Sequence, residues 1–164
     1  MDIYYQSDKF KQLLRRYEEL QEDNISEFLD PEELTDVAEY YHYIGEDNKA
    51  LEAVDYAIHM YPTATIPLSF KARLALFCND DPQLADEIAE MIVDKTDLDY
   101  LYLKAEIMIV DNRAAEADDF LQSQYDAIIS QEDREDYVLD VAALFSDYEE
   151  TEYLEKWLSR STKT

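Results

Sequence analysis

The side chains best suited to chemistry in this chain are two histidines, His42 and His59, and one cysteine, Cys78. A zinc site uses several histidine or cysteine ligands at a regular spacing, and two scattered histidines with one cysteine do not provide it. The acids that follow Cys78 raise the pKa of a thiol, whereas a nucleophilic cysteine needs a basic neighbour. We therefore expect no metal site, no cofactor and no covalent catalysis here.

Acidic residues gather in short clusters, which raises calcium binding and glycoside hydrolysis as further kinds of chemistry. A calcium-binding loop arranges its oxygen ligands around a central glycine, and none of these clusters contains one. Helical glycosidases that use paired carboxylates are much longer than this chain. We interpret the clusters as solvated helix faces and expect the protein not to be an enzyme. The clusters are Asp94, Asp97 and Asp99; Asp118 and Asp119; and Glu132, Asp133, Glu135 and Asp136.

The charge balance restricts the partners of the chain. Forty acids and fourteen bases give a net charge of −26. Such a field repels nucleic acids and anionic membranes, so we expect neither as a partner. A lone cysteine is typical of a reducing compartment. No apolar run reaches the length of a membrane span, and no basic-then-apolar signal opens the sequence. These features together predict a cytoplasmic protein.

A single glycine, Gly45, points to helices rather than sheets. Phosphate-binding loops and tight β-hairpins need several glycines, because they require positive φ angles. Apolar residues spaced three and four apart predict a helix over residues 8–23. We predict an all-α fold of roughly nine helices. The expected helix starts are Asp30-Pro31, Asp81-Pro82 and Ser130, and the expected stops are Gly45 and the residue before Pro62.

The helices also repeat along the chain. Small residues recur at intervals of 34, 33 and 37 residues, and a second series follows them at intervals of 35, 32 and 37. A period near 34 residues with two helices in each unit is typical of helical repeat proteins. The first series is Ala38, Ala72, Ala105 and Ala142, and the second is Ala50, Ala85, Ala117 and Leu154.

The unit from Pro31 to Pro62 resembles the tetratricopeptide repeat (TPR) family. It carries Leu34-x2-Val37-Ala38-x2-Tyr41, then Gly45, Ala50-x3-Val54, Ala57 and the closing proline. The chain also resembles acidic TPR proteins of Bacteroides-type bacteria. The resemblance implies a right-handed helical-hairpin solenoid, with residues 1–30 as an N-terminal capping helix and connector. Four units are expected at approximately 31–64, 65–97, 98–133 and 134–164.

In the TPR family the first helix of each pair lines a concave face on which partners usually bind. Some relatives hold a terminal carboxylate there with lysine and asparagine, but only one base, Arg73, stands on this face. An acidic face with aromatic edges favours a basic or amphipathic protein segment as the partner. The implied face residues are Glu32, Thr35, Glu39, His42, Tyr43, Ile66, Ser69, Arg73, Leu76, Asp99, Tyr102, Glu106 and Ile109.

Two other functions remain open from the sequence. Residues 17–155 hold seven bases and thirty-eight acids, a density that fits a nucleic-acid mimic or an acidic chaperone for basic proteins. The chain is alternatively a structural segment of a longer scaffold. Salt separates the first alternative from groove binding, because a mimic depends on charge alone and loses its partner as salt rises.

The C-terminal helix is expected to leave an apolar side uncovered. The last repeat of a solenoid needs a polar outer face, and only four residues follow Arg160. We therefore expect an exposed patch anchored on Trp157, covered either by a second copy of the chain or by more of a longer parent protein. The patch residues are Tyr153, Leu154, Trp157 and Leu158.

Overall fold

The computed structural model describes residues 2–23, 28–127 and 129–161. Over these residues the chain forms ten α-helices and no β-strand, so the expected all-α fold is confirmed. The extra helix arises because Ser7 divides the N-terminal segment into two. The helices are α1 Asp2–Gln6, α2 Asp8–Asp23, α3 Pro31–Tyr43, α4 Asp47–Met60, α5 Thr65–Phe77, α6 Pro82–Glu90, α7 Leu98–Val110, α8 Ala114–Ala127, α9 Arg134–Asp147 and α10 Thr151–Ser161.

The N-terminal ends of the helices follow from their capping residues. The Asp30 side chain accepts a hydrogen bond from the Glu33 amide, and the Glu33 side chain accepts one from the Asp30 amide. This reciprocal capping box starts α3 at a proline that has no amide hydrogen to lose. Asp81 caps α6 in a similar way through the Leu84 amide. The expected start at Ser130 is wrong, because α9 begins four residues later, after the N-cap residue Asp133.

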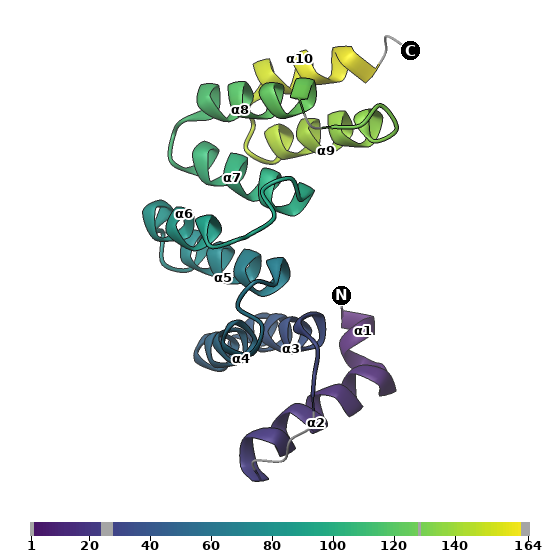
Figure 1. The fold of residues 1–164 in the computed structure, drawn as a ribbon, viewed down its shortest axis with the longest axis vertical. Coiled ribbons are helices and arrows are strands. Elements are labelled where there is room, and N and C mark those ends of the chain that lie inside the picture. The colour runs from purple at the N-terminus through teal and green to yellow at the C-terminus, as the bar shows by residue number, and fades with distance from the viewer. Residues whose placement is uncertain (1, 24–27, 128, 162–164) are drawn as a thin grey trace.

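Consecutive helices pack as pairs: α3 with α4, α5 with α6, α7 with α8, and α9 with α10. The pairs follow one another in a row along the long axis of the molecule (Figure 1). The first helix of each pair contacts both helices of the preceding pair, as α5 contacts α3 and α4. Helices α1 and α2 lie at the end of the row beside α3. The row therefore places α3, α5, α7 and α9 next to one another.

The repeated small residues of the first helices are buried. The side chains of Ala38, Ala72 and Ala105 are completely buried, and Ala142 is nearly so, which confirms the expectation for Ala38 and Ala72. Alanine at a crossing lets two backbones approach closely, and larger neighbours fill the space beside it. The buried residues form two apolar clusters, one mainly in α1–α4 and one in α5–α10.

The turn inside each pair repeats as well. Each contains one residue with a positive φ angle: Gly45 at 84°, Asp80 at 50°, Asn112 at 66° and Glu149 at 57°. In three of the turns the amide of the next residue donates to the carbonyl oxygen five residues earlier, as Glu46 does to Tyr41. In the α5–α6 turn the Asp81 amide donates to the Ala75 carbonyl oxygen, six residues earlier. This left-handed closure of a helix end is the Schellman type. Only the first of these four turns uses glycine, so a search of the sequence for glycine finds that turn and misses the other three.

Candidate functional site

The thirteen expected face residues lie on α3, α5 and α7, but their exposure differs. Thr35, Leu76 and Ile109 are buried, so the expectation that they line a binding face is wrong. Thr35 donates its hydroxyl hydrogen to the Pro31 carbonyl oxygen at 2.7 Å, and Leu76 and Ile109 belong to the apolar core of α5–α10. The cause is the position of α5 and α7 in the row. Each packs against helices of its own pair and of both neighbouring pairs, so residues on several sides of the helix are buried.

The remaining expected residues divide by exposure. Glu32, His42, Tyr43, Ile66 and Asp99 are exposed. The half-buried ones are Glu39, Arg73, Tyr102 and Glu106. Ser69 is buried, although it still lines a hollow beside Arg73.

Two adjoining hollows on α3, α5 and α7 share the side chain of Ile66, and we call them together the Ile66 hollow. Their volumes are about 370 Å³ and 170 Å³. Ile66 is 41% exposed, as several other large apolar side chains of this chain are, and acids surround it in both hollows. The larger hollow is lined by Asp30, Pro31, Glu32, Ala64, Thr65, Ile66 and Asp97, and the smaller by Glu39, Ile66, Ser69, Phe70, Arg73 and Asp99.

Arg73 is the one base that lines the Ile66 hollow, and its guanidinium is already engaged. One terminal nitrogen donates to the Ser69 hydroxyl oxygen at 2.5 Å, and Nε lies 3.3 Å from Glu106 Oε1. The other oxygen of Glu106 accepts a hydrogen bond from the Tyr148 hydroxyl at 3.0 Å. Arg73 and Glu106 therefore neutralise each other within the protein, and the carboxylates around Ile66 set the charge of the hollow.

Glu39 is the half-buried member of the carboxylates that this arrangement leaves unmatched. Within the described residues no hydrogen bond or ion pair reaches its side chain. Burial raises the pKa of the Glu39 carboxyl, and the negative charge of Asp36 raises it further. Asp36 itself accepts a hydrogen bond from the Tyr4 hydroxyl at 3.0 Å, and burial raises the pKa of that carboxyl too. Burial and repulsion from Asp36 therefore disfavour the ionised form of Glu39, and a nearby cation would offset both effects.

Tyr102 and Glu106 contribute less to an open surface than the sequence implies. The Tyr102 hydroxyl donates to Asp140 Oδ2 at 2.8 Å, and its ring stacks on that of Tyr137 with centroids 5.9 Å apart. These contacts join α7 to α9. Of the expected face residues, the exposed Glu32 and Asp99 lie beside Ile66 in the hollow.

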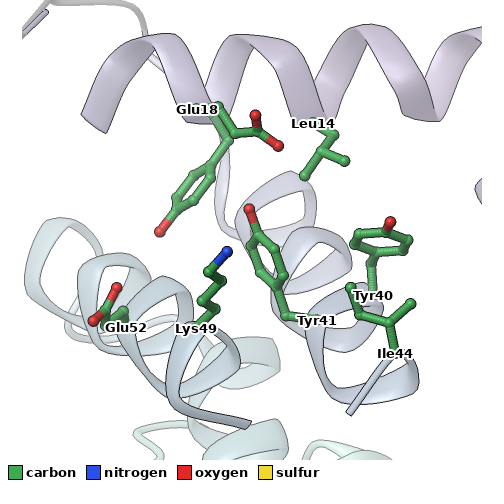
Figure 2. A pocket seen from close by; sticks show the side chains of 8 residues that line it. Leu14, Glu18, Tyr40, Tyr41, Ile44, Lys49 and Glu52 are labelled. Atoms are coloured by element: carbon green, nitrogen blue, oxygen red, sulfur yellow. The ribbon is translucent and has the colours of Figure 1, made fainter. Parts of the chain in front are cut away.

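A second hollow lies outside the expected face, between α2 and the pair α3–α4 (Figure 2). Its volume is about 460 Å³. Figure 2 shows the Lys49 side chain reaching up between Glu52 and the Tyr41 ring, with Glu18 and Leu14 descending from α2. The Lys49 ammonium lies 5.7 Å from the Tyr41 ring centroid, and burial raises the pKa of Tyr41 to about 12. Sequence reasoning missed this hollow, because the repeat pattern does not say where α2 packs.

The expectation of an exposed C-terminal patch anchored on Trp157 is wrong. Trp157 has no exposed surface, so it does not anchor an open interface. Its indole nitrogen donates to Asp118 Oδ1 at 2.7 Å, and Lys156 Nζ donates to Asp118 Oδ2 at 2.5 Å. Tyr153 and Leu154 are half-buried against the second core, and only Leu158 is exposed. Asp118 was interpreted as part of a solvated acidic face, whereas it is buried and holds α10 onto α8.

Three residues with metal-ligating atoms come together at the turn of the first pair. His42 Nδ1 lies 2.9 Å from Asp47 Oδ1, and ligand atoms of His42, Asp47 and Cys78 all lie within 4.8 Å of one another. Burial raises the pKa of the Cys78 thiol, and the charge of Asp47 raises it further, in the direction expected from the sequence. Sequence reasoning counted histidines and cysteines alone and left out the carboxylate between them.

No model of a known protein family matches the sequence, and no curated protein matches it. Among the described residues, no helix is both long enough and apolar enough to cross a lipid bilayer.

Proposed function

We propose that this chain is a non-catalytic protein-binding module of the TPR type. In this proposal the helix pairs wind into a right-handed solenoid, and the helices before Pro31 cap its first unit. The Ile66 hollow then lies on the concave face and holds a basic or amphipathic segment of another protein.

Two features support a repeat architecture. The first helices of the pairs adjoin one another in order, as α3, α5, α7 and α9 do. Each pair also closes with a left-handed residue two or three positions after its first helix. An array of such pairs presents one extended surface, which can bind a long segment of a partner protein.

The observation that carries the binding proposal is the exposed Ile66 set among unmatched carboxylates, with Glu39 half-buried beside it. A lysine or arginine can lay its aliphatic stem across Ile66 while its charged end reaches Glu39. The resulting charge-assisted hydrogen bond is stronger than a neutral one. An acidic partner would instead meet the charges of Glu32, Asp97 and Asp99.

The test uses two fluorescent peptides of equal composition, one a lysine–leucine amphipathic helix and the other a scrambled sequence without an apolar face. We expect the amphipathic peptide to bind more tightly. Replacing Ile66 by Ser and Glu39 by Gln should each weaken its binding by about tenfold, the effect of a lost contact of roughly 1.4 kcal/mol. Fluorescence anisotropy at two salt concentrations measures both affinities.

Matched controls lie on the second helices of the pairs. Leu51 on α4 is 41% exposed, as Ile66 is, and Glu155 on α10 is an exposed acid. Leu51→Ser and Glu155→Gln should leave the affinity unchanged. The proposal fails if both peptides bind equally and lose binding together as salt rises, which is the behaviour of a nucleic-acid mimic or an acidic chaperone. A complete absence of binding favours the structural-segment alternative.

A further inference from the structure

The ends of three helices meet at the turn of the first pair. His42 is the penultimate residue of α3, Asp47 is the first residue of α4, and Cys78 directly follows α5. Each offers one ligand atom, and the three atoms lie within 4.8 Å of one another. All three side chains are exposed, so an ion reaches them from solvent without any rearrangement of the core.

We propose that His42, Asp47 and Cys78 form a binding site for a divalent transition metal ion of the zinc type. An imidazole nitrogen, a thiolate sulfur and a carboxylate oxygen are the ligand types that zinc uses in proteins. Bonds of about 2.0–2.3 Å to a tetrahedral ion place the ligand atoms roughly 3.3–3.8 Å apart. Small rotations of exposed side chains bring the three atoms to that spacing, and water takes the fourth position.

The surroundings suit a cation, because Asp47 places a carboxylate beside the His42 ring and the Cys78 thiol. A bound dication takes the place of the thiol proton, which passes to solvent. The same ion also satisfies the Asp47 carboxylate, whose hydrogen-bond partner among the described residues is otherwise the His42 ring.

The thiol gives the site its selectivity. With a net charge of −26 the chain attracts every cation, and magnesium and calcium prefer its many carboxylates. Sulfur and imidazole ligands instead select zinc, cobalt and related ions. A genuine site therefore keeps its ion in a large excess of magnesium, whereas ions held by surface carboxylates exchange.

Occupancy would join the first pair of helices to the second. His42 and Asp47 belong to the α3–α4 pair, and Cys78 lies at the end of α5 in the next pair. The link spans thirty-one residues of chain between Asp47 and Cys78, so an ion bound to the folded state opposes separation of the pairs. This effect does not depend on the proposed peptide-binding function.

The experiment titrates the reduced full chain with Co²⁺ in excess Mg²⁺, because cobalt reports its ligands by absorption. We expect saturation at one equivalent, a thiolate-to-cobalt charge-transfer band in the near ultraviolet, and loss of that band when Zn²⁺ is added. One proton should be released for each ion bound at a pH where the thiol is protonated.

Variants separate this site from general binding by acids. Cys78→Ser should abolish the charge-transfer band, and His42→Gln and Asp47→Asn should each weaken binding by about tenfold or more. His59→Gln, at the other exposed histidine, should change nothing. Zn²⁺ should raise the melting temperature of the native chain but not that of Cys78→Ser. The proposal is overturned if no thiolate band forms, or if Cys78→Ser binds Zn²⁺ as tightly as the native chain does.

Discussion

The two ends of the molecule close their cores by different means. The N-terminal core, mainly in α1–α4, is covered by two extra helices that lie before the first pair. The C-terminal core, in α5–α10, is closed by the second helix of its last pair. The first pair is thus covered by helices from outside it, whereas the α9–α10 pair contributes the buried Trp157 to its own core.

The N-terminal core is closed by aromatic rings. Tyr5 and Phe10 meet the ring of Tyr40 with centroids 5.3 Å and 5.0 Å apart, and Tyr17 meets Tyr41 at 6.3 Å. The contacts of Tyr5 and Tyr17 are edge-to-face and that of Phe10 is tilted, and such aromatic pairs add modest energy beyond the burial of their surface. They also leave space, because the hollow of about 460 Å³ lies between α2 and the first pair.

The C-terminal core instead contains buried polar partners. Asp118 accepts hydrogen bonds from both Lys156 and Trp157, and the nearly buried Lys104 donates to Asp86 and Glu90. Buried charges are tolerated when their hydrogen bonds are satisfied. Removal of one partner leaves the other charge buried and unpaired, which destabilises the fold. We therefore expect the C-terminal closure to be more sensitive to substitution than the N-terminal one.

The largest expected effect comes from Trp157→Ala. This change empties a fully buried site and leaves Asp118 without its indole donor, so the free energy of unfolding should fall by about 3–5 kcal/mol. Urea unfolding followed by circular dichroism measures it. Leu158→Ala, at the adjacent and 40% exposed position, should cost less than about 1 kcal/mol. Equal losses in the two variants would mean that α10 does not close the core through Trp157.

A smaller effect is expected from Ala38→Leu in the N-terminal core. Ala38 has no exposed surface, so a larger side chain must push α3 away from its neighbours. Overpacking of this kind costs about 1–3 kcal/mol. Ala143→Leu on α9 is the matched control, because Ala143 is exposed and has room for the side chain. A native-like melting temperature for Ala38→Leu would show that the first pair packs more loosely than its burial indicates.

The sequence predicted local features better than features that depend on how the helices pack together. The helix over residues 8–23, the cap at Asp30 and the buried Ala38 follow from spacing and residue type, which local sequence determines. Thr35, Leu76 and Ile109 were misplaced because their burial depends on how many helices surround α3, α5 and α7. Asp118 was misinterpreted because an acid beside another acid looks solvated, and only the fold brings Trp157 to it.

The turns allow a finer comparison of the two ends. The first pair turns at Gly45, which adopts a φ angle of 84° without strain, whereas the last pair turns at Glu149 with a φ angle of 57°. A left-handed conformation costs a residue with a Cβ atom about 1 kcal/mol. Glu149→Gly should therefore raise the melting temperature by a few degrees. Glu152→Gly, inside the first turn of α10, should lower it. A loss of stability in Glu149→Gly would contradict the assigned turn.

The smallest expected effect is the pH dependence that Glu39 gives to the N-terminal half. Its folded-state pKa is raised above the ordinary value of 4.5, so its ionised form destabilises the folded chain at neutral pH. The stability that protonation restores is complete below pH 4.5 and is lost as the pH rises through the raised value. Glu39→Gln should consequently melt higher than the native chain at pH 7, and the gap should narrow as the pH falls towards 4.5. Glu135→Gln on α9 controls for the general relief of negative charge. Equal gaps for the two variants across the whole titration would show that the net charge, rather than the burial of Glu39, governs the effect.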